Sequence, residues 1–269
     1  MSIRGAIAKL GLRLAHWGAK DVSYNDVGYR DAIRSGWYRD ISHELFEGFH
    51  ISSHDTVADV GCGIGGNSHF CAKYASHVIG VDINPANVVA ARERLQSLGK
   101  ATFDVLTSDG NPLPIANATA DKIICTEVLE HVDDPHQFLA ELARIGKRGA
   151  LYLLSVPDAL SEQVLKKVSP EASYKKPNHI RVIEREDFER MVTDAGLSIV
   201  KHTYYGFYWT IWNAIVWQTR IDFNTGHHPV LDHWAAAWKA LLELEDGEIC
   251  RRALNLAMPK SQIIIAQKN

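Results

Sequence analysis

Residues 56–66 read TVADVGCGIGG, and residues 77–82 read HVIGVD. Both stretches contain short apolar runs rich in β-branched residues, which are typical of buried strands. The glycines after the first run satisfy GxGxxG between a strand and a helix, an arrangement that lets the backbone approach a nucleotide closely. Asp82 follows about 20 residues after the first glycine, where a carboxylate suits a ribose diol. These stretches predict the start of a nucleotide-binding α/β unit.

Strands and helices continue to alternate on the carboxyl side of these motifs. Such alternation predicts an α/β fold with a doubly wound, mostly parallel sheet covered by helices on both faces. We expect further strands at residues 103–106, 122–125, 150–156, 197–203 and 261–267. The predicted parts of the chain are a helical extension at residues 1–54, a cofactor-binding core at 55–203 and 261–269, and a helical cap at 204–260.

Composition excludes several classes of protein. The chain is 46% hydrophobic and 23% charged, which is ordinary for a globular protein and unlike a disordered or collagen-like chain. A net charge of −3 gives no basic surplus, so we expect no nucleic-acid partner. Four cysteines without CxxC spacing predict free thiols in a reducing cytoplasm. No apolar run is long enough for a transmembrane helix, and the N-terminus lacks the pattern of a signal peptide.

Residues 1–20 combine a basic surplus with an apolar face at helical spacing. The face consists of Ile3, Ile7, Leu10, Leu14 and Trp17. Two interpretations stay open: a helix folded over the domain as a lid, or a helix lying on an anionic membrane surface. The second interpretation predicts a cytoplasmic protein with peripheral contact at the inner membrane face.

Three carboxylates extend the nucleotide motif. Asp59 stands two residues before the first glycine, where it suits a cationic group such as an amino-acid ammonium. Asp82 ends the second strand, and Asp109 follows the third strand, where it suits an adenine amino group. Dinucleotide oxidoreductases share the glycine motif, so a NAD dehydrogenase remains a rival interpretation.

The chain resembles class I S-adenosylmethionine-dependent methyltransferases, and most of all the branch containing ubiquinone- and menaquinone-pathway enzymes. The stretches that carry the resemblance are VADVGCGIGG, VIGVDINP, SDGNPLP and ICTEVLEHVDDP, and it extends over roughly residues 55–200 and the last strand. It implies a Rossmann-like methyltransferase fold of seven strands whose last strand is antiparallel. It also implies that S-adenosylmethionine is bound by Asp59, Gly61, Cys62, Gly63, Asp82, Ile83, Asp109, Gly110 and Glu127.

The stretch from Glu127 to His131 has the form ExxEH, and His179 follows in a later loop. This set is similar to the metal ligands of ubiquinone-pathway O-methyltransferases and of small-RNA 3′-terminal 2′-O-methyltransferases. On one helical turn Glu127, Glu130 and His131 would share a face, and with His179 they predict a site for Mg²⁺, Mn²⁺ or Zn²⁺. With the metal bound, His179 or His131 would help to remove the proton of an acceptor hydroxyl. The alternative is a metal-free structural turn, in which one of these histidines acts as the base directly or positioning alone suffices. His131, His179 and Glu127 are therefore the candidate catalytic residues.

The 57 residues from Tyr204 to Lys260 form a longer connection than is usual in this family and contain five of the seven tryptophans. They either pack the cap onto the sheet or line an apolar acceptor pocket. A second addition, at residues 161–178, is read as a mobile lid or a solvated loop. We expect methyl transfer to a hydroxyl of a small or lipid-linked acceptor, such as a diol, a catechol or a sugar. The alternatives are metal-independent C- or N-methylation of an aromatic metabolite and a non-catalytic cofactor-binding module.

Overall fold

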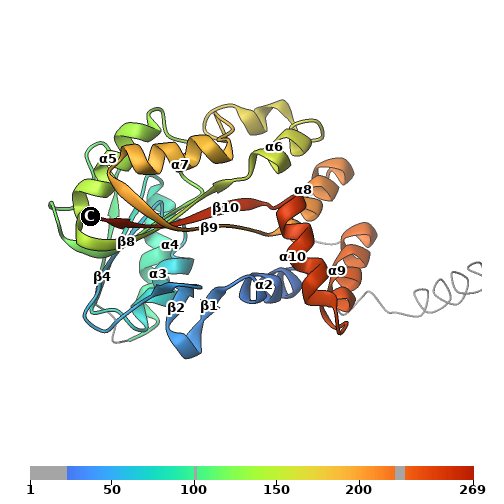
Figure 1. The fold of residues 1–269 in the computed structure, drawn as a ribbon, viewed down its shortest axis with the longest axis horizontal. Helices are drawn as coiled ribbons and strands as arrows, with labels where there is room; N and C mark the ends of the chain where they lie inside the picture. Colours follow the sequence, from blue (N-terminus) through green and yellow to red (C-terminus); the bar gives the residue numbers. More distant parts are fainter. Residues whose placement is uncertain (1–22, 100–101, 222–227) are drawn as a thin grey trace, which may run out of the picture.

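The computed structural model describes residues 23–99, 102–221 and 228–269. A seven-stranded sheet crosses the molecule (Figure 1). In sheet order its strands are β6 (Phe103–Thr107), β5 (His77–Asp82), β4 (Thr56–Val60), β7 (Ala120–Thr126), β8 (Gly146–Pro157), β10 (Ser261–Lys268) and β9 (Leu197–Tyr205). All neighbouring strands from β6 to β8 pair in parallel, whereas β10 is antiparallel to both β8 and β9. This confirms the predicted fold class, including the antiparallel last strand.

Successive residues of the central strands are buried on opposite faces of the sheet, because side chains alternate along a strand. Ile123 and Cys125 of β7 pack with the helices on one face, whereas Ile124 packs on the other. The first face is covered by α5 (Pro135–Ile145) and α7 (Arg185–Asp194), and the second by α3 (Gly66–Ala72) and α4 (Pro85–Gln96). Both faces of the sheet are therefore covered by helices, as the apolar runs of the strands predicted.

The N-terminal extension contains a small sheet that the sequence did not predict. After α2 (Tyr24–Arg34), three short strands pair antiparallel: β1 (Trp37–Arg39), β2 (Glu44–Phe46) and β3 (Phe49–His50). Their buried aromatic side chains pack against α3 and the main sheet. The predicted amphipathic helix at residues 1–20 lies outside the described residues.

Three helices stand between β9 and β10: α8 (Phe207–Thr219), α9 (Pro229–Leu242) and α10 (Gly247–Ala257). With α2 they form the helical end of the molecule in Figure 1. Trp238 is 2% exposed, and its Nε1 donates to Asp31 of α2 at 3.0 Å. Trp234 stacks on Tyr208, with ring centroids 5.8 Å apart. These aromatic side chains therefore hold the cap and α2 together.

No helix within the described part of the chain combines the length and the apolar character that crossing a bilayer requires.

Candidate active site

The glycine-rich turn connects β4 to α3 at the carboxyl end of the sheet. A Cβ at Gly61, where φ is +76°, would lie 2.2 Å from Val128 Cγ2, so only glycine fits there. A Cβ at Gly63, where φ is +54°, would meet nothing within 4 Å. The turn thus packs on the protein at Gly61 and is open at Gly63, as a surface for a ligand requires.

Asp82 lies directly beside this turn. Its Oδ2 accepts from the Gly63 backbone N–H at 2.8 Å, and its Oδ1 accepts from the Asn84 N–H at 2.9 Å. The next residue, Ile83, is 70% exposed, although it is a large apolar side chain. This strand end presents a fixed carboxylate next to an uncovered apolar surface, a combination suited to a ribose and an adjoining flat ring.

Asp109 and Gly110 follow β6, the neighbouring strand. Asp109 is exposed, and its Oδ1 accepts from the Asn111 N–H at 3.1 Å. A Cβ at Gly110 would lie 2.4 Å from the ring of Phe138, so this glycine has a packing role. The sheet order β6-β5-β4 puts Asp109, Asp82 and the glycine turn in one row.

Asp59 is buried beneath the turn. It is 1% exposed, and its Oδ2 accepts from the Ser68 hydroxyl at 2.5 Å. Burial raises the pKa of Asp59 to about 6, although the hydrogen bond from Ser68 opposes this shift. Cys62 is also buried, and burial raises the pKa of its thiol. Both predicted cofactor residues are therefore buried below the turn rather than exposed on its open surface.

An ion pair that the sequence did not indicate stands at the end of β7. The Lys260 ammonium donates to Glu127 Oε2 at 2.6 Å, and the Ser155 hydroxyl donates to Oε1 at 2.9 Å. Burial favours the neutral acid, but the charge of Lys260 and these hydrogen bonds outweigh it and hold the pKa of Glu127 below its ordinary value. The φ of Glu127 is +58°, a conformation that is costly for a non-glycine residue and that clusters at functional sites.

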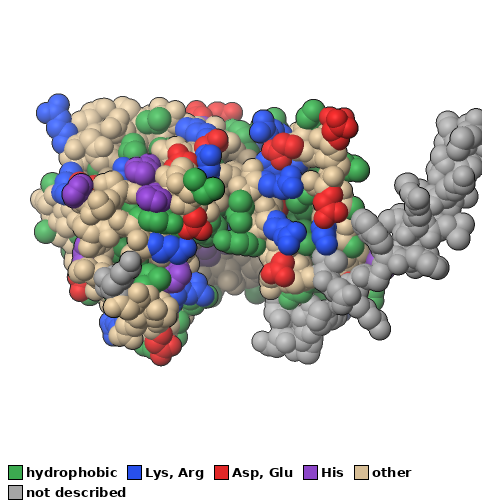
Figure 2. Space-filling model, turned by 90° about the horizontal axis from the view of Figure 1, so that it is seen from below, with side chains coloured by type: hydrophobic (Ala, Val, Ile, Leu, Met, Phe, Trp, Pro, Cys, Tyr) green, Lys and Arg blue, Asp and Glu red, His purple; other side chains and the backbone are tan. Residues whose placement is uncertain are grey.

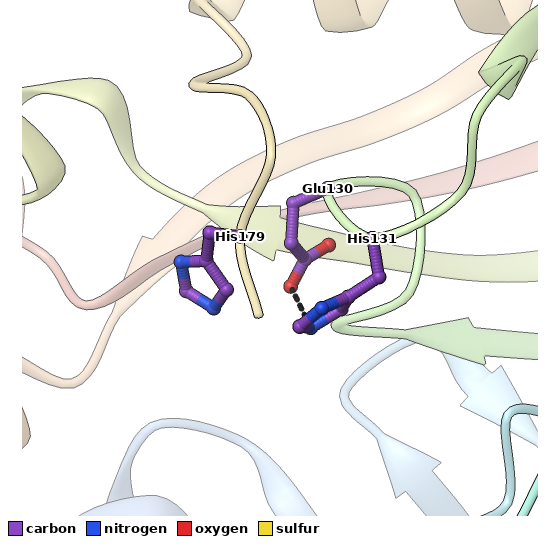
Figure 3. A group of neighbouring side chains, drawn as sticks. All are labelled: Glu130, His131 and His179. Atoms are coloured by element: carbon purple, nitrogen blue, oxygen red, sulfur yellow. Dashed lines mark ion pairs between the residues drawn. The ribbon is translucent and has the colours of Figure 1, made fainter. Parts of the chain in front are cut away.

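Glu130, His131 and His179 come together beside this pair (Figure 3). One ligand atom from each residue lies within 4.8 Å of the others. Glu130 is 1% exposed, and neither carboxylate oxygen has a hydrogen-bond partner. Nε2 of His131 lies 3.7 Å from Oε1. Burial, with the charge of Glu127 beside it, raises the pKa of Glu130 well above its ordinary value.

The structure thus divides the four predicted metal ligands. Residues 127–131 form a bend and turns rather than the helical turn that was expected to align their side chains. Glu130 and both histidines converge, whereas Glu127 pairs with Lys260. Lys260 ends the cap, 133 positions beyond Glu127, so no local motif could have indicated this contact.

A second polar contact missed by the sequence joins the N-terminal sheet to this end of the main sheet. The Tyr38 hydroxyl donates to Asn67 Oδ1 at 3.0 Å, and the Asn67 amide donates to Thr126 Oγ1 at 3.3 Å. Tyr38 therefore places the N-terminal sheet beside the glycine turn and the end of β7.

Part of the chain is similar in sequence to known methyltransferases. Residues 58–154 match the family model described as "Methyltransferase domain". Norajmaline N-methyltransferase of Rauvolfia serpentina is 30% identical over 133 residues, 48% of this chain and 43% of that protein. Ubiquinone biosynthesis O-methyltransferase of Hahella chejuensis is 38% identical over 95 residues, 35% of this chain and 40% of that protein. The chain therefore spans less than half the length of these two relatives.

Solved structures show the same fold. An S-adenosylmethionine-dependent methyltransferase from Mesorhizobium loti aligns with a TM-score of 0.53 and 13% identity, over 81% of this chain and 92% of that one. At this identity the likeness concerns the fold alone. The sequence match to a methyltransferase-domain model thus lies within residues 58–154, and the likeness to the solved structure extends over the fold.

Proposed function

We propose that this chain transfers the methyl group of S-adenosylmethionine to a hydroxyl of a small or lipid-linked acceptor, such as a diol, a catechol or a sugar. We further propose that a divalent ion held by Glu130, His131 and His179 assists the transfer. The observation that carries this proposal is the Glu130 carboxylate, which is buried without a hydrogen-bond partner between two imidazoles.

A buried carboxylate needs compensation, because desolvating an unpaired charge costs several kcal/mol. Glu130 has three ways to obtain it: keeping a proton, pairing with an imidazolium, or binding a cation. Two imidazoles beside a carboxylate form a donor set typical of a divalent metal, and this favours the third way. With only one carboxylate, the set suits Zn²⁺ or Mn²⁺ better than Mg²⁺, which prefers oxygen ligands.

The row of carboxylates gives the orientation of the cofactor. We infer that Asp109 and Asp82 hold the adenosine, with Ile83 beneath its ring, and that the glycine turn holds the methionine end. Gly61, Gly63 and Cys62 then lie closest to the sulfonium, and Asp59 supplies negative charge below them. Because β7 is the next strand, the methyl group faces Glu127 and the three-residue cluster.

Each protein group then has a defined part in the transfer. A divalent ion, when bound, would lower the pKa of an acceptor hydroxyl as a Lewis acid, so that its proton passes to solvent water and the oxygen takes the methyl group as S-adenosylhomocysteine leaves. Glu127, kept ionised by Lys260, accepts a hydrogen bond from the acceptor and orients it toward the sulfonium, because methyl transfer depends on in-line positioning. One imidazole nitrogen cannot hold the ion and take the proton at once. His131 and His179 are therefore bases only in the metal-free alternative.

The proposed partners follow from the surface and the extension. Figure 2 shows lysines and arginines interspersed with acidic residues over the helical end of the molecule, without a continuous basic patch on that face. This supports a small or lipid-linked acceptor over a nucleic acid. The basic residues 1–20 support peripheral contact with an anionic cytoplasmic membrane surface, where a lipid-linked acceptor would lie.

Methyl transfer to paired catechol and arylamine acceptors tests the proposal. We expect transfer to the catechol, loss of turnover after treatment with a chelator, and recovery when Mn²⁺ or Zn²⁺ is added back. Glu130→Gln should not recover with either ion, whereas Glu171→Gln, at an 85% exposed carboxylate, should behave as the wild type. Unchanged turnover in the chelator would exclude the metal.

N-methylation is the second candidate, because the Rauvolfia serpentina relative acts on nitrogen. A metal-independent C- or N-methyltransferase would prefer the arylamine, or a ring carbon of the catechol, and would be insensitive to the chelator. The site of methylation in the product, determined by mass spectrometry and NMR, separates these reactions.

A further inference from the structure

We propose that Glu162 is a positioning residue that holds the His179 ring with Nε2 toward Glu130, and that the segment between β8 and α7 is built to frame the metal centre. This inference rests on the proposed function and assigns a purpose to the second addition to the core. That addition includes α6 (Ala159–Leu165) and a short 3-10 helix (Glu171–Tyr174).

The contact that carries the inference joins Glu162 to His179. Oε2 of Glu162 lies 2.9 Å from His179 Nδ1, and Glu162 is 4% exposed although it belongs to a connecting segment. With Glu162 ionised, its carboxylate only accepts hydrogen bonds, and Nδ1 of His179 is the donor. In the neutral ring, Nε2 then carries the lone pair, and the ring is fixed in the tautomer that binds a metal through Nε2.

The same segment also holds the ring of His131 through its Nδ1 atom. Its Nδ1 lies 3.1 Å from the backbone carbonyl oxygen of Pro177, which can only accept a hydrogen bond. The Nε2 atom of His131 therefore faces Glu130, at 3.7 Å from Oε1. With Nδ1 of each ring held by this segment, Nε2 is the nitrogen left to face the cluster, in which one ligand atom of each residue lies within 4.8 Å of the others (Figure 3).

The backbone around Glu162 is anchored by two neighbouring contacts. Glu162 lies in the first turn of α6, whose N-cap residue is Asp158. Oδ2 of Asp158 accepts a hydrogen bond from the Arg185 guanidinium at 2.7 Å. The Tyr174 hydroxyl donates to the backbone carbonyl of Glu162 at 3.2 Å. The segment that sequence alone read as a lid or a solvated loop therefore has a buried carboxylate fixed on both sides.

An alternative role for Glu162 is a plain ion pair with a doubly protonated His179. In that case His179 would neutralise Glu130 as well, and the site would need no metal. The two roles differ in the protonation of Nε2, which NMR measures in the metal-free protein.

The experiment compares Glu162→Ala and Glu162→Gln with Glu171→Gln, which removes an exposed carboxylate from the same segment. Mn²⁺ and Zn²⁺ are titrated separately into the full-length, metal-free protein, and the dissociation constants are measured by calorimetry. We expect Glu162→Ala to weaken binding about 10- to 100-fold, as is typical for the loss of an outer-shell partner. Glu162→Gln keeps an acceptor oxygen and the side-chain volume, so it should be intermediate, and Glu171→Gln should be unchanged.

The second readout is the ¹⁵N spectrum of the His179 ring without metal. We expect a protonated Nδ1 and an unprotonated Nε2 in the wild type, and a mixture of tautomers in Glu162→Ala. Equal metal affinities of wild type and Glu162→Ala, or a wild-type ring protonated on both nitrogens, would overturn the inference. If the wild type binds neither ion, the proposed metal fails. The tautomer of His179 in Glu162→Ala then decides separately whether Glu162 positions the ring.

Discussion

Asp59→Asn removes a carboxylate that is buried in β4, beneath the glycine-rich turn. Burial raises the pKa of Asp59 to about 6 from an ordinary value of 3.8, which corresponds to about 3 kcal/mol at 1.36 kcal/mol per pKa unit. The folded protein therefore binds this proton more tightly than the unfolded chain does. Stability from this group is greatest below pH 4 and falls as the pH rises to about 6, above which the full cost of ionisation is present.

The substitution should consequently stabilise the cofactor-free protein at pH 8 by up to about 3 kcal/mol and change little near pH 4. Asparagine keeps an oxygen that can accept from Ser68, so the packing should be retained. Urea unfolding at both pH values measures the difference, and Asp194→Asn, at an exposed carboxylate, is the control. Equal effects at the two pH values would refute the reasoning, because the gain would not come from ionisation.

The same variant should lose affinity for S-adenosylmethionine. A cationic ligand near Asp59 favours the ionised carboxylate, so wild-type affinity should increase between pH 5 and pH 8. Asp59→Asn should bind more weakly at pH 8, and the part of the pH dependence due to this carboxylate should disappear. A variant that is more stable and still binds the cofactor as the wild type does would show that Asp59 serves only the fold.

Three further predictions concern the other buried charges. Lys260→Met removes the ammonium that lowers the pKa of Glu127, so the acidic limb of the pH–rate profile should move to higher pH. In a protein that also carries Glu127→Gln, the same substitution should leave that limb where it is. Glu130→Gln should raise the melting temperature of the metal-free protein and abolish the stabilisation by Mn²⁺, which for the wild type should be about 2.7 kcal/mol at 100 times the dissociation constant. Trp238→Phe removes a hydrogen bond to Asp31, and burial raises the pKa of that carboxyl to about 6. The substitution should lower the free energy of unfolding in urea by about 1–3 kcal/mol at pH 8, and by less at pH 5, where Asp31 is protonated. An equal cost at both pH values would show that this bond does not depend on the charge of Asp31.

The sequence predicted the sheet well because its strands are bounded by local signals. Glycine ends β4 and an acidic residue ends β5, and both strands were placed residue for residue. The N-terminal sheet was missed because its strands have only two or three residues, too few for an alternating pattern to be visible. Its stability comes from packing against α3 and the main sheet, which a local pattern does not report.

The site was predictable where one strand end supplies the residue and unpredictable where distant segments meet. The order of Asp59, Asp82 and Asp109 along the sheet follows from the βαβ topology, so the motif sufficed. Lys260 and Glu162 reach the site from elements that the motif does not contain. Both are ordinary charged residues in the sequence, and only their contact with an oppositely charged or ring-nitrogen partner distinguishes them.

These contacts change where the determinant of acceptor specificity should be sought. The sequence left open whether the tryptophans of the cap pack it in place or line an apolar acceptor pocket, and in the structure Trp238 is buried against α2 and Trp234 donates to the Tyr208 carbonyl. Those two side chains pack the helices of the cap against one another and against α2. The cap instead delivers one charged group, Lys260, to the strand end that faces the proposed methyl group. A cationic group there favours an acceptor oxygen that carries partial negative charge in the transition state. Replacing Lys260 should therefore change the choice between hydroxyl and amine acceptors more than replacing Trp234 does.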